Sequence, residues 1–475
     1  MDTAQRRAVA ELLRVAPVID DLGARFAAAG YELHLVGGSV RDALLGRLGN
    51  DLDFATDARP EQVLELAQGW AEATWDTGIS FGTVGLSRRG FTLEVTTFRS
   101  EAYDSSSRHP QVRYGESLAE DLVRRDFTVN AMAISLQQHL FLDPHGGLVD
   151  LAGKLLRTPG RPEDSFDDDP LRMLRAARFA SQLGFTVDPG VVTAATDMAA
   201  RLAIISAERK QAELSKLLLG RHPKAGLELL VDTGLAEHVL PELPAMRLEI
   251  DPLHQHKDVY AHTLAVLDRA IALEPAGPDL TLRMAALLHD IGKPRTRAKE
   301  PGGGVSFHHH EVVGASMTRT RLKALRYPKR FTDEVATLVK LHLRFHGYGT
   351  GAWSDAAVRR YVSDAGPLLD RLNRLVRSDC TTRNRSKAAA LSAAYDELEE
   401  RIARLREQEA IDALRPDLDG AAVMTLLGIP PGPVVGRALR HLLELRTEHG
   451  PLGYDAAVAE LHRWAAEQGL TPTAG

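Results

Sequence analysis

Two aspartates beside a glycine-rich turn are the residues of this chain best suited to chemistry. Asp51 and Asp53 flank Leu52, so if this segment is a strand, both carboxylates project from the same face. Such a pair can hold Mg²⁺, and two metal ions can activate an attacking hydroxyl and stabilise a leaving pyrophosphate. A lone Asp-x-Asp is more often a pair of solvated loop residues, so its surroundings decide.

A short strand is expected from Tyr31 to Val36, because this segment alternates and ends in apolar residues. It leads into a glycine turn, where backbone amides can approach a triphosphate closely. A hydroxyl and a guanidinium follow the turn. The alternative is an ordinary hairpin turn. The candidate nucleotide contacts in this segment are Gly37, Gly38, Ser39 and Arg41.

The run G-G-S-V-R-D followed by D-L-D resembles the head of the class II tRNA nucleotidyltransferase and poly(A) polymerase family, whose signature is G-G-x-V-R-D and then D-x-D. Two further runs match that family. R-R-D-F-T-V-N-A at 124–131 is close to its R-R-D-F-T-x-N-A, and D-D-P-L-R at 168–172 stands where it has E-D-x-x-R, with Asp168 in place of Glu. The resemblance covers most of the chain.

The resemblance implies a metal-dependent nucleotidyltransferase in which Asp51 and Asp53 bind Mg²⁺ and Glu94 is a third acidic residue near the metals. Glu94 lies in the second of two expected strands, Gly78 to Leu86 and Phe91 to Phe98. A carboxylate there needs a reason, because an unpaired buried charge is costly. A structural ion pair, or a side chain that simply faces water, is the alternative.

The second run offers phosphate and sugar contacts. Arginines suit phosphate oxygens because their fork of donors is always charged. Asp126 can accept a hydrogen bond from a ribose hydroxyl, which would favour ribonucleotides. The resemblance assigns sugar recognition to Arg125 and Asp126. An Arg–Asp pair at a helix N-terminus is the alternative, and Asn130 is equally consistent with a structural role.

The third run is expected to open a helix at Asp168, with Asp169 and Arg172 on one face. Cytosine and adenine each show an exocyclic amine beside an unprotonated ring nitrogen, whereas uracil and guanine show a carbonyl beside an N–H. A carboxylate beside a guanidinium can therefore select C and A without a nucleic-acid template, as the resemblance also implies. Arg175 can reach phosphates or pair with an acid. Ser206 to Arg209 has N-cap character and no expected catalytic role.

A series of histidines and aspartates follows downstream, beginning in a helical run and continuing in the adjacent pair His289-Asp290. Its order, H…HD…H…H…D, resembles the HD phosphohydrolase superfamily, and His and Asp are the expected ligands of a hydrolytic transition-metal site. A lone histidine is more often a satisfied core residue. Matching the order gives His262, His289, Asp290 and Asp379 as core ligands of Mn²⁺, Ni²⁺ or Fe²⁺, with His310 and His342 as further ligands or phosphate contacts.

Composition fits a large enzyme with several domains, since 475 residues of which 44% are hydrophobic can bury more than one core. No apolar run is long enough to cross a bilayer, the segment after Met1 is charged, and Cys380 is the only cysteine. No membrane contact and a cytoplasmic location are expected. The net charge of −6 means that any RNA contact is local. Two basic clusters, Arg319 to Arg330 and Arg371 to Lys387, are candidates, although such runs are usually solvated helix faces.

The expected fold class is α+β. A nucleotidyltransferase-type α/β head in residues 1–155 precedes a helical, RNA- and nucleotide-binding neck and body in 156–248, an HD domain in 249–394 and a helical tail in 395–475 that resembles the RNA-contacting end of the family. Arg99 to Glu116 is polar and carries Pro110, so a mobile loop is expected. In the resembling family this region is associated with the switch to adenosine addition, and cytidine-only members have it shortened or altered. Here it is intact.

The expected function is template-independent addition or repair of the 3′-terminal C-C-A of tRNA from CTP and ATP, in which the tRNA 3′ hydroxyl attacks the α-phosphate. A poly(A) polymerase, or an enzyme adding part of C-C-A, shares the head motifs. A hypothesis of another class makes the HD unit the enzyme, a phosphatase or cyclic phosphodiesterase, and the head an RNA-binding module. The expected partners are the tRNA 3′ end, ATP and CTP. The sequence does not determine the oligomeric state.

Overall fold

The computed structural model describes residues 3–76, 78–79, 82–102, 111–115, 117–248, 258–300, 305–345, 348, 353–380, 384–409 and 415–470. The chain divides into two compact units, Met1–Pro244 and Ala245–Gly475, each considered by itself below. The four-domain division within these units stays a prediction. Among the described residues, no helix has both the length and the apolar character that a membrane span requires.

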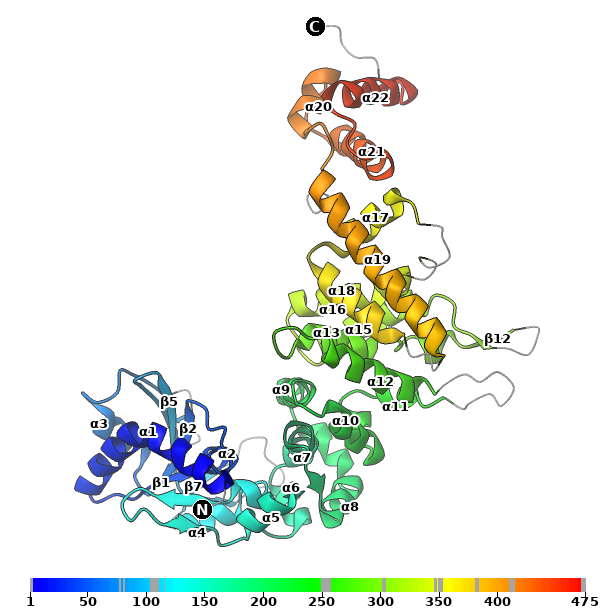
Figure 1. Cartoon of the computed structure of the whole chain (residues 1–475). Helices are drawn as coiled ribbons and strands as arrows, with labels where there is room; N and C mark the ends of the chain where they lie inside the picture. The colour runs from blue at the N-terminus through cyan, green and yellow to red at the C-terminus, as the bar shows by residue number, and fades with distance from the viewer. Residues whose placement is uncertain are drawn as a thin grey trace. The chain divides into compact units, whose positions relative to one another are not determined.

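One mixed sheet forms the centre of the head (Figure 1). Its strands are β1 Leu33–Val36, β2 Asp51–Thr56, β3 Ala73–Trp75, β4 Thr83–Arg88, β5 Phe91–Thr97, β8 Ala133–Ser135 and β9 Phe141–Leu142, in the spatial order β3-β4-β5-β2-β1-β8-β9. β2 and β5 run parallel, and every other neighbouring pair is antiparallel. The α/β head and the strands predicted around the glycine turn and Glu94 are therefore confirmed.

Helices cover this sheet because their apolar residues recur at helical spacing. The helices of the head are α1 Thr3–Ala28, α2 Gly38–Leu44, α3 Pro60–Ala67, α4 Leu118–Val123, the 3-10 turn η2 Thr128–Asn130 and α5 Gly147–Gly153. In α1, Val15, Val18, Leu22 and Phe26 are buried, and this stripe faces α2 and β1. α2 begins directly after the glycine turn, so the sheet and α1 together fix where that turn lies.

The segment predicted to be a mobile loop begins and ends in paired strands. β6 (Arg99–Ala102) and β7 (Gln111–Tyr114) form an antiparallel hairpin, with Arg99 opposite Tyr114. The loop prediction is wrong for these strands, because polar composition says little about backbone pairing. Residues 103–110, including Pro110, lie outside the described part of the chain.

The neck and body are almost wholly helical. Their elements are α6 Pro162–Asp168, α7 Leu171–Leu183, α8 Pro189–Asp197, η3 Ala199–Ile204, α9 Ala207–Leu218, α10 Pro223–Asp232, η4 Leu235–His238 and α11 Glu242–Ala245. α7 packs against both α9 and α10. The all-α prediction is wrong in one detail, since β10 (Leu155–Leu156) pairs in parallel with β11 (Thr186–Val187) across 31 residues of chain. Only tertiary packing brings two such short segments together.

The second unit is helical apart from a small hairpin, β12 (Ala298–Lys299) with β13 (Val305–Ser306), which the all-α prediction also missed. Its remaining elements are α12 Val259–Ala272, α13 Leu280–Leu288, α14 Lys293–Thr296, α15 His310–Ala324, α16 Lys329–Leu341, η5 His342–Phe345, α17 Asp355–Ala365, η7 Gly366–Leu368, α18 Leu369–Asp379, α19 Arg385–Glu409, α20 Gly420–Leu427, α21 Pro433–His449 and α22 Tyr454–Glu467. α12, α13, α16 and α18 pack on one another. α19 runs unbroken across residue 394, where a domain boundary was expected (Figure 1). Val423, Leu442 and Leu461 belong to the separate core of α20 to α22.

Candidate nucleotidyl-transfer site and a histidine–aspartate centre

Three carboxylates share one face of the head sheet. Asp51 and Asp53 are exposed on β2, and Leu52 between them is buried. Asp53 lies directly opposite Glu94 in the parallel pairing of β2 with β5. Glu94 is exposed on β5 and takes part in no ion pair among the described residues, so the structure offers no support for the structural ion pair, and a side chain that simply faces water remains the alternative. The predicted catalytic acids are thus neighbours on adjacent strands.

The electrostatics of Asp53 reflect this crowding. Asp53 reaches solvent, but the protein packed around its carboxyl partly desolvates it and so raises its pKa. The neighbouring charges of Glu94 and Asp51 raise this pKa further, and Arg125 and Arg41 lower it, with a net result of about 6. Three like charges around one position favour a divalent cation, which would offset their repulsion. The donor set is all oxygen, and this suits Mg²⁺.

The glycine turn packs directly against these acids. Gly37 has φ 69°, a backbone conformation that favours glycine, and a Cβ there would lie 2.8 Å from Nη1 of Arg125 and force that guanidinium to shift. A Cβ on Gly38 would lie 3.9 Å from Oδ2 of Asp53. The hydroxyl of Ser39 is buried and accepts a hydrogen bond from the backbone N–H of Asp53 at 2.9 Å. Ser39, predicted to be a nucleotide contact, therefore holds β2 in place.

Arg41 begins a chain of buried polar contacts that links α2 to α7. It donates to Oδ1 of Asn130 at 2.6 Å, and Nδ2 of Asn130 donates to Oδ1 of Asp126 at 2.9 Å. Nε of Arg175 donates to Oδ2 of Asp126 at 2.7 Å. Although burial raises the pKa of Asp126, the Arg175 guanidinium and the Asn130 hydrogen bond hold that pKa well below its usual range. Of the two roles predicted for Arg175, the structure shows the pairing with an acid.

Both carboxylate oxygens of Asp126 accept hydrogen bonds from the protein. Oδ1 accepts a second one, from the backbone N–H of Phe127 at 2.8 Å. Sugar recognition by Asp126 stays a prediction. Arg125 is held by Asp121, to which its Nε and Nη2 donate at 3.1 and 2.8 Å. Arg124 donates to the other Asp121 oxygen at 2.8 Å. These arginines lower the pKa of the buried Asp121 to about 2 against the raising effect of burial.

The predicted start of the third helix is wrong. Asp168 is the last residue of α6, Asp169 is extended with φ −144° and ψ 100°, and α7 begins at Leu171. The cause is Pro170, whose ring disfavours helical geometry in the residue before it. Asp169 still lies at the start of α7, where its Oδ1 accepts from the backbone N–H of Leu171 at 3.1 Å.

The predicted base-selecting pair is anchored by residues outside the pair. The buried Arg172 donates to the hydroxyl of Ser165 at 2.8 Å and to the carbonyl of Arg124 at 2.6 Å, so its guanidinium has a fixed orientation. Asp169 accepts from Nη2 of Arg209 at 2.7 Å. Arg209 belongs to α9, in the segment to which no catalytic role was assigned. Base selection by Asp169 and Arg172 stays a prediction.

A second α9 residue holds α7 from within. Glu213 lies 3.1 Å from Nε of Arg178, and both side chains are buried. Burial, together with the nearby Arg175, lowers the pKa of Arg178 to about 10 in spite of Glu213. The guanidinium of Arg178 also lies 4.2 Å from the ring centroid of Phe179. Sequence reasoning missed Arg178, Glu213, Arg209 and Asp121. Only for Asp121, three and four residues before two arginines, was there a local signal.

The second unit brings together all six predicted ligands of the HD domain. They form two groups, each with its ligand atoms within 4.8 Å of one another: His262, His289 and Asp379, and then Asp290, His310 and His342. Asp290 joins the groups, because its Oδ2 lies 3.2 Å from Nε2 of His289 and its Oδ1 lies 3.3 Å from Nε2 of His310. His308 is largely exposed, so the structure selects His310 from the histidine run.

The histidines of this centre are oriented as metal ligands. Nδ1 of His289, His310 and His342 lies 2.8, 2.8 and 2.7 Å from a backbone carbonyl oxygen, so Nε2 is directed inward. Nε2 of His310 and of His342 is buried with no hydrogen-bond partner among the described residues. Burial and His289 lower the pKa of His342 to about 4, which keeps its ring neutral and able to bind metal. This donor set fits a divalent transition metal.

Comparisons with known proteins agree with this geometry. Family models match as Poly A polymerase head domain at residues 33–157, as probable RNA and SrmB-binding site of polymerase A at 184–246, and as HD domain at 259–401. The A-adding tRNA nucleotidyltransferase of Deinococcus radiodurans is 37% identical over 91% of this chain and 95% of its own length. The CCA-adding enzyme of Levilactobacillus brevis is 42% identical over 52% of this chain and 62% of its own length.

Among solved structures, the CCA-adding enzyme of Bacillus stearothermophilus in complex with CTP matches with a TM-score of 0.69 and 26% identity over 99% of each chain. The Thermotoga maritima CCA-adding enzyme complexed with tRNA, at 16% identity and a TM-score of 0.59, shares the fold. A relative 37% identical and matched over nearly its whole length establishes the family. The chain therefore belongs to the tRNA nucleotidyltransferases and is an enzyme of nucleotidyl transfer.

Proposed function

We propose that this enzyme adds or repairs the 3′-terminal C-C-A of tRNA, using CTP and ATP and releasing pyrophosphate. The observation that carries the proposal is the acidic face of Asp51, Asp53 and Glu94 beside the Gly37 turn. The CCA-adding and A-adding activities named for the relatives support the choice of substrates. A cytoplasmic location is part of the same proposal.

In this proposal Asp51, Asp53 and Glu94 hold Mg²⁺, which supplies charge neutralisation and activation of the tRNA 3′ hydroxyl. The chain's own residues bind and orient the triphosphate. The Gly37 and Gly38 turn allows the phosphates close to the backbone, because neither glycine carries a side chain. Arg41 and Arg125 lie beside the same turn and provide positive charge for the phosphates.

Base selection falls to Asp169 and Arg172. Arg172 is held rigidly by Ser165 and the Arg124 carbonyl, so its donors have a fixed direction. Asp169 keeps 19% of its side chain exposed, which leaves an acceptor near Arg172 accessible to an incoming base. Its bond to Arg209 positions the carboxylate, and for this reason we assign Arg209 a positioning role. Fixed donors and acceptors distinguish bases better than mobile ones.

Three truncated tRNA substrates test how many nucleotides the enzyme adds. Labelled CTP and ATP are supplied separately and together to three tRNAs, which lack C-C-A, C-A or A alone. Growth of all three to C-C-A and no further supports the proposal. Extension only of the tRNA that lacks the final A would instead identify an A-adding enzyme, the activity named for the relative matched over 91% of this chain. Long A tails would identify a poly(A) polymerase.

A second activity is favoured by the histidine–aspartate centre. We propose that its six residues bind a divalent transition metal and hydrolyse phosphoesters, as favoured by the inward Nε2 atoms of His310 and His342, which make no hydrogen bond within the described part of the chain. The test supplies Mn²⁺ or Ni²⁺ and a 2′,3′-cyclic nucleotide. Asp290→Asn should abolish hydrolysis and leave CTP incorporation intact, whereas Asp53→Asn should do the reverse. Hydrolysis that survives Asp290→Asn would refute this second activity.

A further inference from the structure

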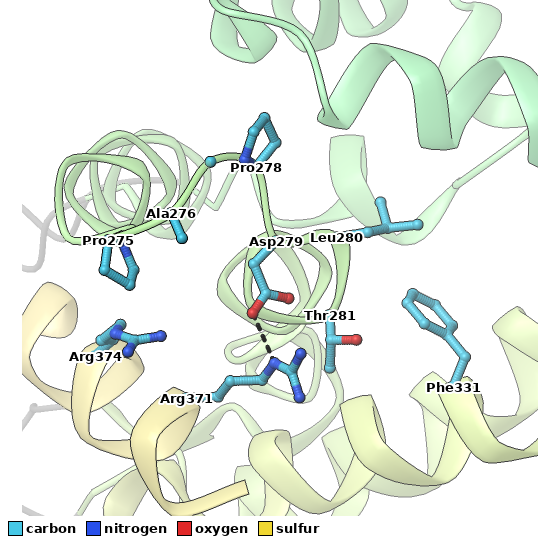
Figure 2. Close-up of a pocket in the computed structure, with 10 residues that line it drawn as sticks. Pro275, Ala276, Pro278, Asp279, Leu280, Thr281, Phe331, Arg371 and Arg374 are labelled. Atoms are coloured by element: carbon cyan, nitrogen blue, oxygen red, sulfur yellow. Dashed lines mark hydrogen bonds and ion pairs between the residues drawn. The ribbon is translucent and has the colours of Figure 1, made fainter. Parts of the chain in front are cut away.

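A surface cavity of about 460 Å³ lies in the second unit and is lined by none of the six histidine–aspartate ligands. Its walls are the loop Pro275 to Pro278 with the start of α13, the first turns of α18, and Phe331 near the start of α16. Figure 2 shows Arg371 and Arg374 reaching from α18 toward this loop, with Phe331 at another side of the cavity. The cavity thus combines positive charge with an aromatic face.

The charge of the cavity is net positive. Asp279 is the one acid among the described residues that line it, and both of its oxygens accept hydrogen bonds: Oδ2 from Nε of Arg371 at 2.7 Å, and Oδ1, which caps α13, from the N–H of Leu282 at 3.1 Å. Arg374 lies 3.6 Å from Asp370, whose side chain is 74% exposed, so water screens this pair strongly. The Asp279–Arg371 pair is neutral as a whole, so the net positive charge of the lining comes from Arg374.

Glu274 holds in place the loop that forms one wall of the cavity. Glu274 accepts from the backbone N–H of Asp279 at 2.9 Å and from Nε of Arg283 at 2.7 Å. The side chains of Glu274 and Arg283 are 5% and 4% exposed, so this is a buried and strong contact. A cavity with a fixed wall loses little entropy when a ligand binds.

Phe331 forms the aromatic wall of the cavity. Phe331 is half-buried and stacks on Tyr327, with ring centroids 4.9 Å apart and planes at 19°. Lys329 and Arg330 precede it at the start of α16, and the other cluster contributes Arg371 and Arg374. Lys329 and Arg330 do not line the cavity, so its positive charge comes from the second cluster alone. Arginines next to an aromatic ring are the usual means of holding a phosphate and its base.

We propose that this cavity binds one unpaired nucleotide of the tRNA substrate, with its phosphate on Arg371 and Arg374 and its base against Phe331. The inference rests on the proposed function, because that function supplies the RNA. A free CTP or ATP offers the same chemistry of a phosphate next to a base. The experiment therefore has to distinguish an RNA occupant from a free nucleotide.

The test measures the affinity of the full chain for tRNA lacking C-C-A, by fluorescence anisotropy at several salt concentrations. Arg374→Gln should raise the Kd about threefold to tenfold near 0.1 M salt and reduce the slope of log Kd against log salt by about 0.7 to 1, because one phosphate contact is lost. Phe331→Leu should raise the Kd about fivefold without changing the slope. Arg360→Gln, which changes an exposed arginine of α17 paired with Glu448, is the matched control and should change neither value.

Two further variants protect the test from trivial loss of folding. Arg374→Lys keeps the charge and should keep the salt slope. Asp53→Asn should bind tRNA normally while incorporating no nucleotide, so binding and transfer are read separately. Tight wild-type binding with equal Kd and slope in Arg374→Gln, Phe331→Leu and the control would overturn the inference, yet leave incorporation as support for the proposed function. A raised KM for CTP or ATP with unchanged tRNA affinity in Arg374→Gln would assign the cavity to a free nucleotide and also overturn it.

Discussion

Protonation of Asp53 should weaken Mg²⁺ binding to the head, and it should do so at a pH that is unusually high for an aspartate. The metal needs the ionised carboxylate of Asp53, whose pKa is raised to about 6 by burial and by Glu94 and Asp51. With that pKa, about one Asp53 in eleven is ionised at pH 5, so the apparent Kd for Mg²⁺ should rise about tenfold between pH 7.5 and pH 5. An aspartate with its ordinary pKa near 4 would be almost fully ionised at both values.

The sign follows from linkage. Because the pKa of Asp53 is higher in the folded chain than in the unfolded one, its contribution to stability is complete below about pH 4 and is lost as pH rises through about 6. Bound Mg²⁺ opposes that loss, so the rise in melting temperature caused by Mg²⁺ should be largest above pH 6 and should shrink as the carboxyl is protonated.

Calorimetric titration with Mg²⁺ at pH 5, 6 and 7.5 tests this, in an Asp290→Asn background that disables the histidine–aspartate centre. Arg125→Gln is a control variant for which the direction of the change is also predicted. The positive charge of Arg125 lowers the pKa of Asp53, so removing this charge should move the pH midpoint of the Mg²⁺ affinity to higher pH. A Kd that changes less than twofold over this range, or a midpoint that moves to lower pH in Arg125→Gln, would refute the reasoning.

Three other outcomes follow from single contacts. Glu213→Gln leaves the cation of Arg178 buried without its partner, so the free energy of unfolding measured in urea should fall by about 3–5 kcal/mol. Combining Arg178→Met with Glu213→Leu should restore much of this stability, and a loss under about 1 kcal/mol in Glu213→Gln would contradict the prediction. Ser39→Ala removes the acceptor for the Asp53 N–H, so kcat should fall and the unfolding free energy should drop by about 1 kcal/mol while the KM for tRNA holds; an unchanged kcat would count against it. His310→Ala should weaken Mn²⁺ binding at least about tenfold by calorimetry and spare CTP incorporation; equal Mn²⁺ affinity would exclude His310 as a ligand.

The sequence predicted what depends on local pattern. Alternation around Leu52 placed Asp51 and Asp53 on one face, and the resemblance added Glu94, although only the sheet shows that Glu94 lies opposite Asp53. The order of histidines and aspartates likewise predicted the six residues that the structure brings together, and their role as ligands stays a prediction. That Asp290 joins two groups depends on how separate helices pack, which the spacing alone does not determine.

What sequence reasoning missed depends on distant contacts. Arg209 meets Asp169 across 40 residues, and Glu213 meets Arg178 across a helix-to-helix interface, so neither pairing leaves a periodic signal. The helix start was predicted at the wrong residue for a local reason. Pro170 suits the first turn of a helix, but it also keeps Asp169 extended, so α7 begins only after the proline. The β6–β7 hairpin was missed because the polar strands of an isolated two-stranded hairpin resemble loops in composition.

The most direct test of the central claim is incorporation of labelled CTP and ATP together, with Mg²⁺, into a tRNA that lacks its C-C-A end. The wild-type chain should add nucleotides and stop at C-C-A, and Asp53→Asn should add none although it still binds the tRNA. No incorporation by the wild type, or undiminished incorporation by Asp53→Asn, would contradict a nucleotidyl-transfer site built on Asp51, Asp53 and Glu94.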